Sequence, residues 1–202
     1  MPPAFSAEEK TRITALLLET GHKLFTTQGL RKTSLEDLMA PTGVAKSSFY
    51  VFFDSKEDLY LELMIRQSSE VKRKVINGAL LSADTPREGL RRFLRATLDE
   101  LATNPLWRRL MTHPEEMQAV ARKLDPTRVT AMADNPVTAL NDYIDHHQGE
   151  LIPADPQVII GVLQCVLLVP MFAERLGDPA LHHKILDLLI DFVAAGLTAQ
   201  KE

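Results

Sequence analysis

The spacing of apolar and polar positions predicts helices along the whole chain. Apolar residues recur at helical spacing, as Ile13, Leu17 and Leu24 do, which places them on one face of a first helix expected over residues 7–28. We expect Gly29 to end this helix, because glycine readily adopts the backbone conformation that follows a helix C-terminus. Alternation typical of a β-strand does not stand out in the sequence.

Most of the later helix starts carry the same two-residue signal. A side chain that can accept a hydrogen bond precedes a proline, and proline suits the first helical position, where its missing amide has no helical partner. The pairs are Thr85-Pro86, Asn104-Pro105, Asp125-Pro126, Asn135-Pro136, Asp155-Pro156 and Asp178-Pro179, with His113-Pro114 as a weaker case. They account for most of the twelve prolines and predict an all-α chain of about nine helices.

Two helices near the C-terminus are the most apolar part of the chain. Residues 155–176 carry apolar side chains on more than one face, and residues 181–197 carry a second apolar set. One neighbouring helix cannot cover the first of these. It is therefore buried either at the centre of its own domain or in an interface between two chains.

Residues 33–59 predict a compact series of short elements. Thr33 and Ser34 each stand three residues before an acidic residue, which is the spacing of a capping box at a helix start. Gly43 marks the end of this first short helix. The second short helix, expected over residues 45–52, turns Phe49 inward. It leaves exposed a small face that consists of Lys46, Ser47, Ser48, Tyr50 and Val51.

A helix, a tight turn and a second helix with a polar end form the arrangement that inserts a helix end into the major groove of DNA. A third helix is expected to start at Ser55 and to continue to about Leu80, beyond the region that would bind DNA. We therefore expect a three-helix helix-turn-helix domain over residues 1–74 and a helical domain over residues 75–202. The boundary near Lys74 then lies inside a helix.

The stretch resembles the tetracycline-repressor (TetR) family of transcriptional regulators. The family motif has the form T-x-x-D-[IL]-A-x-x-A-G-V-S-x-x-x-[LF]-Y-x-[HY]-F-x-[SN]-K-E-x-L, and Ser34 replaces its opening threonine. The matching residues are Asp37, Leu38, Gly43, Val44, Phe49, Tyr50, Phe53, Ser55, Lys56, Glu57 and Leu59. The departures are Met39, Pro41, Thr42, Ala45 and Phe52. Pro41 predicts a shortened turn, and Ala45 is a poor helix cap.

The resemblance implies a dimeric regulator, most often a repressor, that binds double-stranded operator DNA and is released by a small molecule. The residues expected to contact DNA are Arg31, Lys32, Thr33, Ser34, Lys46, Ser47, Ser48, Tyr50, Val51 and Lys56. Lys56 stands at a helix N-terminus, which suits a phosphate group. The hydroxyl groups of Thr33 and Ser34 can cap a helix, contact phosphate, or do both.

By the same resemblance, the C-terminal domain is expected to bind the effector and to dimerise through a four-helix interface. The pocket candidates combine apolar bulk with some polar groups and are Trp107, Arg108, Met111, His113, Tyr143, Gln164, Cys165, Met171 and Phe172. Ordinary burial in a helical core is the alternative for each of them. The interface candidates are Val158, Val162, Val166, Val169, Ile185, Leu189 and Phe192.

The overall charge limits how such a protein can bind DNA. The formal net charge is −4, which argues against non-specific binding through bulk positive charge. Residues 1–74 carry 11 basic and 10 acidic residues, a net +1, and the remainder therefore carries −5. Specific binding must rest on few phosphate contacts, which dimerisation would double.

Enzymatic and metal-binding chemistry finds little support in the sequence. Glu19 and His22 form one Glu-x-x-His pair, whereas a carboxylate-bridged di-metal bundle needs two. The histidine pairs at 146–147 and 182–183 are adjacent, so their side chains diverge by about 100° on a helix. No Gly-rich phosphate loop, nucleophile elbow or Cys-x-x-Cys is present. We expect no catalytic activity, no cofactor and no metal.

The single cysteine, Cys165, excludes an intrachain disulfide and fits a reducing compartment. The N-terminus lacks an apolar signal core, and the apolar run over 158–172 is interrupted and short for a membrane span. We therefore expect a cytoplasmic protein without a membrane partner. The alternatives are a helical DNA-binding protein with a structural or division-control role and no effector, or a metal-dependent helical-bundle enzyme.

Overall fold

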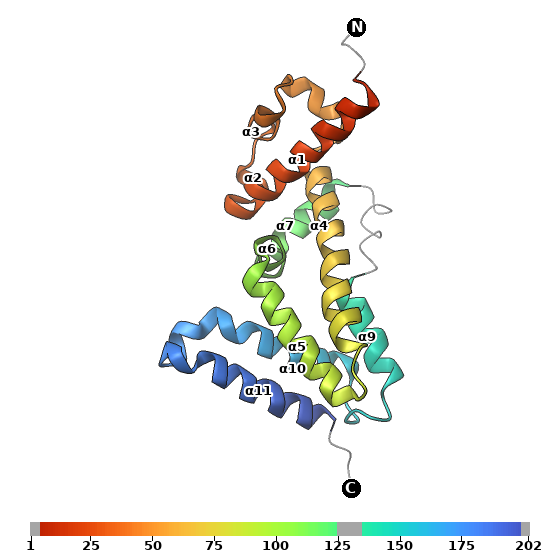
Figure 1. Ribbon diagram of the computed structural model, residues 1–202, viewed down its shortest axis with the longest axis vertical. Coiled ribbons are helices and arrows are strands. Elements are labelled where there is room, and N and C mark those ends of the chain that lie inside the picture. The colour runs from red at the N-terminus through yellow and green to blue at the C-terminus, as the bar shows by residue number, and fades with distance from the viewer. Residues whose placement is uncertain (1–4, 125–134, 199–202) are drawn as a thin grey trace. The chain divides into compact units, whose positions relative to one another are not determined.

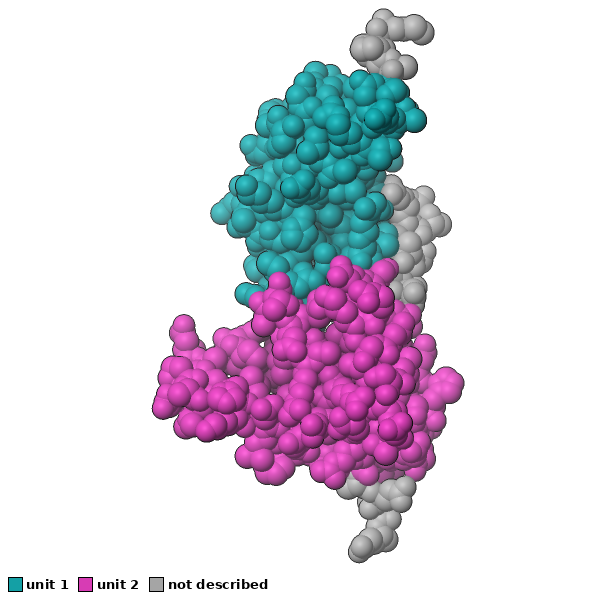
Figure 2. Space-filling view, in the orientation of Figure 1, with its two compact units in different colours: residues 1–68, 104–133 teal, residues 69–103, 134–202 magenta. Residues whose placement is uncertain are grey.

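The computed structural model describes residues 5–124 and 135–198, and every regular element in those two ranges is a helix (Figure 1). The all-α fold expected from the helical spacing is confirmed. The helices form two compact units, and each unit contains two separate parts of the chain (Figure 2). Unit 1 combines residues 1–68 with 104–133, and unit 2 combines residues 69–103 with 134–202.

Unit 1 brings the N-terminal helices together with two helices from the middle of the chain. Its elements are α1 (Ala7–Thr27), α2 (Gly29–Lys32), α3 (Leu35–Met39), the 3₁₀ helices η1 (Ala40–Thr42) and η2 (Lys46–Val51), most of α4 (Lys56–Lys72), α6 (Pro105–Thr112) and α7 (Pro114–Lys123). Phe25 and Tyr60 meet edge to face in its core, with ring centroids 5.1 Å apart. Leu106 of α6 and Val120 of α7 are buried in the same core.

Unit 2 begins with the end of α4 and contains the apolar C-terminal helices. Its further elements are the π-helix η3 (Arg73–Leu80), α5 (Pro86–Thr103), α9 (Pro136–His146), α10 (Pro156–Leu168), the 3₁₀ helices η5 (Val169–Arg175) and η6 (Pro179–Leu181), and α11 (His182–Leu197). Helix α5 packs against η3, α10 and α11, so it lies at the centre of this unit. The long helix expected from Ser55 to Leu80 has the right ends, but its last eight residues are a π-helix.

The proline signals mark helix starts as expected. Helices begin at Pro86, Pro105, Pro114, Pro136, Pro156 and Pro179. The preceding side chain is a true cap in several cases: the side-chain oxygen of Asn104 accepts from the Trp107 amide at 3.1 Å, and that of Asp155 accepts from the Gln157 amide at 2.8 Å. The pair at residues 125–126 lies outside the described residues.

The two units divide the chain differently from the expected boundary near Lys74. The division within α4 falls after Ser68, and residues 104–133 return to the first unit. Sequence order cannot indicate such a return, because α6 and α7 have the same amphipathic pattern whichever core they cover. The N-terminal unit is therefore larger than a three-helix domain.

One apolar helical segment is longer than the sequence-based expectation. Residues 156–175 are long and apolar enough to cross a membrane by length and composition, with a mean hydropathy of 2.0. A core helix of a globular protein meets the same criterion. The segment is also not one continuous helix, since α10 gives way to the 3₁₀ turns of η5 and the backbone is non-helical at Phe172.

Candidate nucleic-acid interface

The start of α3 is fixed by Ser34 and Asp37, which is one of the two capping registers that the sequence allows. The Ser34 Oγ accepts from the Asp37 amide at 3.1 Å, and the Asp37 carboxylate accepts from the Ser34 amide at 3.3 Å. Thr33 has a different role: it is 1% exposed, and its hydroxyl donates to the Gly29 carbonyl oxygen at 2.8 Å. Its prediction as a DNA contact is therefore wrong for the structure described, because its only polar side-chain atom is buried.

The turn after α3 contains the unusual residues Pro41 and Thr42. Pro41 lies within the 3₁₀ helix η1, where its missing amide is tolerated, and Gly43 follows with φ of +71°. The buried Thr42 hydroxyl donates to the Met39 carbonyl oxygen at 2.7 Å and accepts from the Val44 amide at 3.2 Å. The turn is therefore intact, because Pro41 needs no amide at its position and the Thr42 hydroxyl has hydrogen-bond partners.

One buried aromatic side chain holds the candidate recognition helix η2 in place. Phe49 is fully buried and contacts the rings of Tyr50 and Phe53. On the other side, Tyr50 is 61% exposed and Val51 is 54% exposed. Lys46 and Ser47 are also exposed, whereas Ser48 is half-buried. Ala45 provides no side-chain cap, and the helix is a 3₁₀ helix of six residues instead of an α-helix.

Lys46 is paired with an acidic residue on the neighbouring helix. Its ammonium group donates to a carboxylate oxygen of Glu36, in the first turn of α3, and both side chains are more than half exposed. The hydrogen bond from Lys46 is the main reason why the pKa of Glu36 lies below its ordinary value. The same contact raises the pKa of Lys46, so both groups are charged at neutral pH.

The ammonium group of Lys56 forms hydrogen bonds within the protein. Its ammonium group donates to the carbonyl oxygens of Leu30 at 2.9 Å, Thr33 at 2.8 Å and Arg31 at 3.3 Å. An ammonium group has three protons, and these three bonds use all of them. Lys56 therefore ties α4 to the end of α2 and has no donor left for a phosphate, contrary to its predicted role. Arg31 and Lys32 are exposed at this end of α2 and remain candidates for phosphate contact.

A network that the sequence did not indicate ties α6 and α7 to the same unit. Glu116 accepts two hydrogen bonds from the Arg109 guanidinium, at 2.7 and 2.9 Å, one from the Tyr60 hydroxyl at 3.1 Å and one from the Leu30 amide at 3.2 Å. Burial alone would raise the pKa of Glu116, but Arg109 and the other donors outweigh it and hold the pKa below its ordinary value. The network anchors α2 from beneath the candidate interface.

Gly29 is required by this network. Its φ is +82°, and a Cβ atom there would lie 2.1 Å from a guanidinium nitrogen of Arg109. The sequence suggested Gly29 as a helix stop; α1 ends at Thr27 with Gln28 as its cap, and Gly29 begins α2. The approach of Arg109 could not be foreseen, because it lies 80 residues further along the chain.

The predicted effector-pocket residues are divided between the two units. Trp107, Arg108, Met111 and His113 belong to unit 1, and Tyr143, Gln164, Cys165, Met171 and Phe172 belong to unit 2. Trp107 and Tyr143 are core residues of their own units, each 6% exposed, and the Tyr143 ring stacks on His147 at 4.1 Å. The rest are partly or fully exposed.

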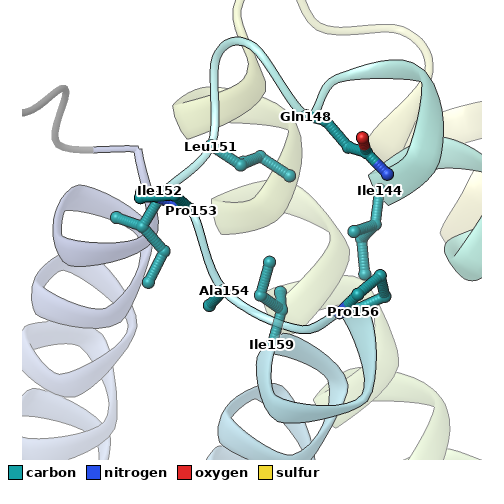
Figure 3. Close-up of a pocket in the computed structure, with 8 residues that line it drawn as sticks. All are labelled: Ile144, Gln148, Leu151, Ile152, Pro153, Ala154, Pro156 and Ile159. Atoms are coloured by element: carbon teal, nitrogen blue, oxygen red, sulfur yellow. The ribbon is translucent and has the colours of Figure 1, made fainter.

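Unit 2 contains a hollow that the sequence did not predict. Its volume is about 270 Å³, and it lies where the end of α9, the following loop and the start of α10 meet. Ile144, Leu151 and Ile159 point toward the space between them (Figure 3). The other lining residues are Gln148, Ile152, Pro153, Ala154 and Pro156. A second hollow in this unit is polar and includes Glu88, Arg91 and Asp191.

The predicted interface residues do not all lie on the surface. Val158, Val162, Ile185 and Phe192 are exposed, and Phe192 is 65% exposed. Val169 and Leu189 are half-buried. Val166 is 2% exposed, because it packs inside its own unit, and it is not available to a partner chain.

Metal-binding geometry is not found among the described residues, where no group of three or more His, Cys, Asp or Glu side chains could hold a metal ion. Cys165 is exposed and unpaired by any disulfide in that part of the chain.

Comparison with known proteins assigns the N-terminal helices to a family. Residues 17–63 match the family model of "Bacterial regulatory proteins, tetR family". Residues 17–63 thus form a TetR-family domain. The TetR-family match begins within α1 and ends within α4, and so includes the whole candidate interface around η2.

Two relatives from Bacillus subtilis strain 168 are also regulators by description. YuxN, an uncharacterized HTH-type transcriptional regulator, is 22% identical over 160 residues, which are 76% of this chain and 55% of YuxN. The chain thus matches about half the length of YuxN. YhgD, likewise uncharacterized and HTH-type, is 26% identical over 190 residues, which are 91% of this chain and 96% of YhgD.

Solved structures share the fold of this chain. A tetR family transcription regulator from Shewanella sp. PV-4 has a TM-score of 0.66 at 20% identity, covering 93% of this chain and 99% of that one. FadR from Bacillus subtilis, solved in complex with stearoyl-CoA, has a TM-score of 0.61 at 15% identity, covering 91% and 98%. These likenesses extend over both units.

Proposed function

We propose that this protein is a ligand-controlled transcriptional repressor that binds operator DNA as a homodimer. The observation that carries the proposal is the exposed polar end of η2, where Lys46, Ser47 and Tyr50 stand above a buried Phe49. Short polar and cationic side chains on a helix end are the groups that read base edges in the major groove. Arg31 and Lys32 supply positive charge at the end of α2 for the phosphate backbone.

Dimer formation is supported by the apolar face of unit 2. Three apolar side chains are each more than half exposed: Val158 of α10, and Leu188 and Phe192 of α11. Phe172 and Leu168 are further exposed apolar side chains of this unit. Monomeric proteins rarely leave several large apolar side chains exposed on neighbouring helices. A second copy of this chain is the proposed occupant. It would supply the second recognition helix, which a two-fold symmetric operator requires about 34 Å from the first.

Control by a ligand is supported by the hollow between α9 and α10. Its volume of about 270 Å³ and its mostly apolar lining suit a small, uncharged or weakly polar molecule. Gln148 is the one polar side chain in the lining and can orient such a ligand by a hydrogen bond. FadR, which shares the fold, was solved with stearoyl-CoA. A ligand here lowers DNA affinity to the extent that it prefers the conformation that does not bind DNA.

DNA binding is tested by fluorescence anisotropy of the full chain with DNA from upstream of its gene, and with unrelated DNA of equal length. A sequence-specific, salt-sensitive complex is expected. Tyr50→Ala should weaken it by about 1–3 kcal/mol. Arg122→Ala, a change at an exposed position of α7 in the same unit, should leave affinity unchanged. Equal affinity for both DNAs would overturn the proposal.

Ligand control is tested by screening medium-chain fatty alcohols and uncharged aromatic compounds for release of the bound DNA. Ala154→Leu adds bulk to the wall of the hollow and should abolish the response while DNA affinity is retained. Ala119→Leu, at an exposed position of α7, is the matched control and should respond as the wild type does. Specific DNA binding that no compound releases would favour a DNA-binding protein without an effector.

A further inference from the structure

We propose that Glu36 is a specificity-determining residue that, together with Lys46, reads one C·G base pair in each operator half-site. This inference rests on the proposed DNA binding and concerns which base pair the interface selects. It is drawn from the pairing of an acidic residue of α3 with the first residue of η2 on the exposed side of both helices.

Glu36 is not needed for the local structure. The cap of α3 is completed by Ser34 and Asp37, and the turn that follows is held by Thr42. The pair with Lys46 joins side chains that are 62% and 53% exposed, and exposed pairs of this kind contribute little to stability. The carboxylate is therefore free to serve another purpose on this surface.

A carboxylate at a DNA interface restricts which contacts are possible. Glu36 can only accept hydrogen bonds, and it repels phosphate oxygens. In the major groove, the exocyclic amino group of cytosine is a donor that suits a carboxylate, and guanine O6 and N7 are acceptors that suit an ammonium group. Both edges belong to the same C·G base pair. The adjacent carboxylate of Glu36 and ammonium of Lys46 match that pair of edges.

The same pairing keeps binding to other sequences weak. On an A·T pair the one donor, adenine N6, lies between the acceptors adenine N7 and thymine O4, which repel the carboxylate and lower the affinity. Glu36 also neutralises Lys46, which removes one cation from the non-specific phosphate contacts. The acidic residue therefore raises the ratio of specific to non-specific binding in a protein whose net charge is already −4.

The test is selection of binding sites from a random DNA pool by the wild type, Glu36→Gln and Glu36→Ala, followed by measured affinities at several salt concentrations. The wild type should select a symmetric site with C·G at one position in each half. Glu36→Ala should lose that preference by about 5- to 150-fold, and Glu36→Gln should shift it toward A·T, because glutamine pairs with adenine. Glu62→Gln, which breaks the exposed pair with Arg66 on α4, is the control and should select the wild-type site.

Non-specific binding provides a second readout. Without its carboxylate partner, Lys46 can contact a phosphate, so the slope of log affinity against log salt should steepen by about 0.9 for each subunit. Unchanged base preference and unchanged slope in both Glu36 variants, with a wild type that selects a site, would overturn this inference and leave the proposed function standing. A wild type that selects no site would overturn both. Circular dichroism melts confirm that each variant is folded.

Discussion

Two lysines near the candidate DNA surface of unit 1 have different structural roles. Lys56 and Lys46 are both lysines near the candidate DNA surface, yet one donates to three backbone carbonyl oxygens and the other projects from η2. The first holds the scaffold, and the second pairs with Glu36 on the exposed surface. We therefore expect replacement of the two lysines to have different effects on the free energy of unfolding.

Lys56→Ala should destabilise the protein by about 1.5–3 kcal/mol, because three carbonyl oxygens lose a charged donor. Lys46→Ala should leave the free energy of unfolding nearly unchanged, since an exposed ion pair contributes little. Urea denaturation followed by circular dichroism measures both. Equal stability of the two variants would show that Lys56 does not anchor α2, and its role as a phosphate contact would then be restored.

Glu116→Gln should destabilise the protein by about 3 kcal/mol at neutral pH, because the largely buried Arg109 guanidinium would lose its negatively charged partner. The pKa of Glu116 is lowered in the folded state, so its contribution is fully present above its ordinary value of 4.5 and is lost as the pH falls through the folded pKa. The difference between wild type and variant should therefore shrink below pH 4.5.

Urea denaturation over a pH series measures this difference. Glu62→Gln removes a solvent-facing pair with Arg66 and is the matched control, with an expected effect below about 1 kcal/mol. A Glu116→Gln effect that stays constant from neutral to acid pH would contradict the proposed ion pair.

At the level of elements, the contact of η3 with α5 depends on a glycine that has an ordinary helical backbone. A Cβ atom at Gly89 would lie 2.9 Å from the Leu80 carbonyl oxygen and 3.1 Å from the Tyr143 hydroxyl. The first neighbour is backbone at the end of η3, so it cannot simply rotate away. The π-helix and α5 can therefore pack closely only because this side chain is absent.

Gly89→Ala should lower stability by about 1–3 kcal/mol, because the added methyl group forces η3 and α5 apart. Gly161→Ala is the matched control within α10, where an added Cβ meets no atom within 4 Å, and it should stabilise by up to about 1 kcal/mol. Thermal denaturation compares the two. A stabilising Gly89→Ala would mean that η3 shifts without cost.

At the level of the whole molecule, the exposed apolar side chains of α10 and α11 are the main unexplained surface of the single chain. Phe192 and Leu188 lie on α11, and Val158 lies on α10. If a second copy covers them, the oligomeric state should depend on these residues and not on apolar exposure in general. Leu81 offers the comparison, because it is 58% exposed at the end of η3.

Phe192→Glu should convert the proposed dimer into monomers, because an interface cannot bury an unpaired carboxylate without large cost. Leu81→Glu should remain dimeric. Sedimentation velocity measures the mass of each species, and DNA binding should weaken together with dimerisation. A Phe192→Glu variant that stays dimeric would place the interface on another surface.

The sequence alone determined the features that depend on local chemistry. The proline signals at helix starts, the turn at Gly43 and the inward position of Phe49 follow from caps, backbone freedom and helical spacing, which act within a few residues. The same local pattern was sufficient to suggest the TetR family. Exposure of Lys46, Ser47, Tyr50 and Val51 also followed from it.

Only the tertiary structure decided which core each helix covers and which partner each polar group takes. Lys56 has the right spacing for DNA contact, but backbone carbonyl groups 23 to 26 residues away use its donors. The return of α6 and α7 to unit 1 and the bond of Glu116 to α2 join residues far apart in the chain. Local propensity carries no information about such contacts, because their free energy arises only when packing brings the partners together.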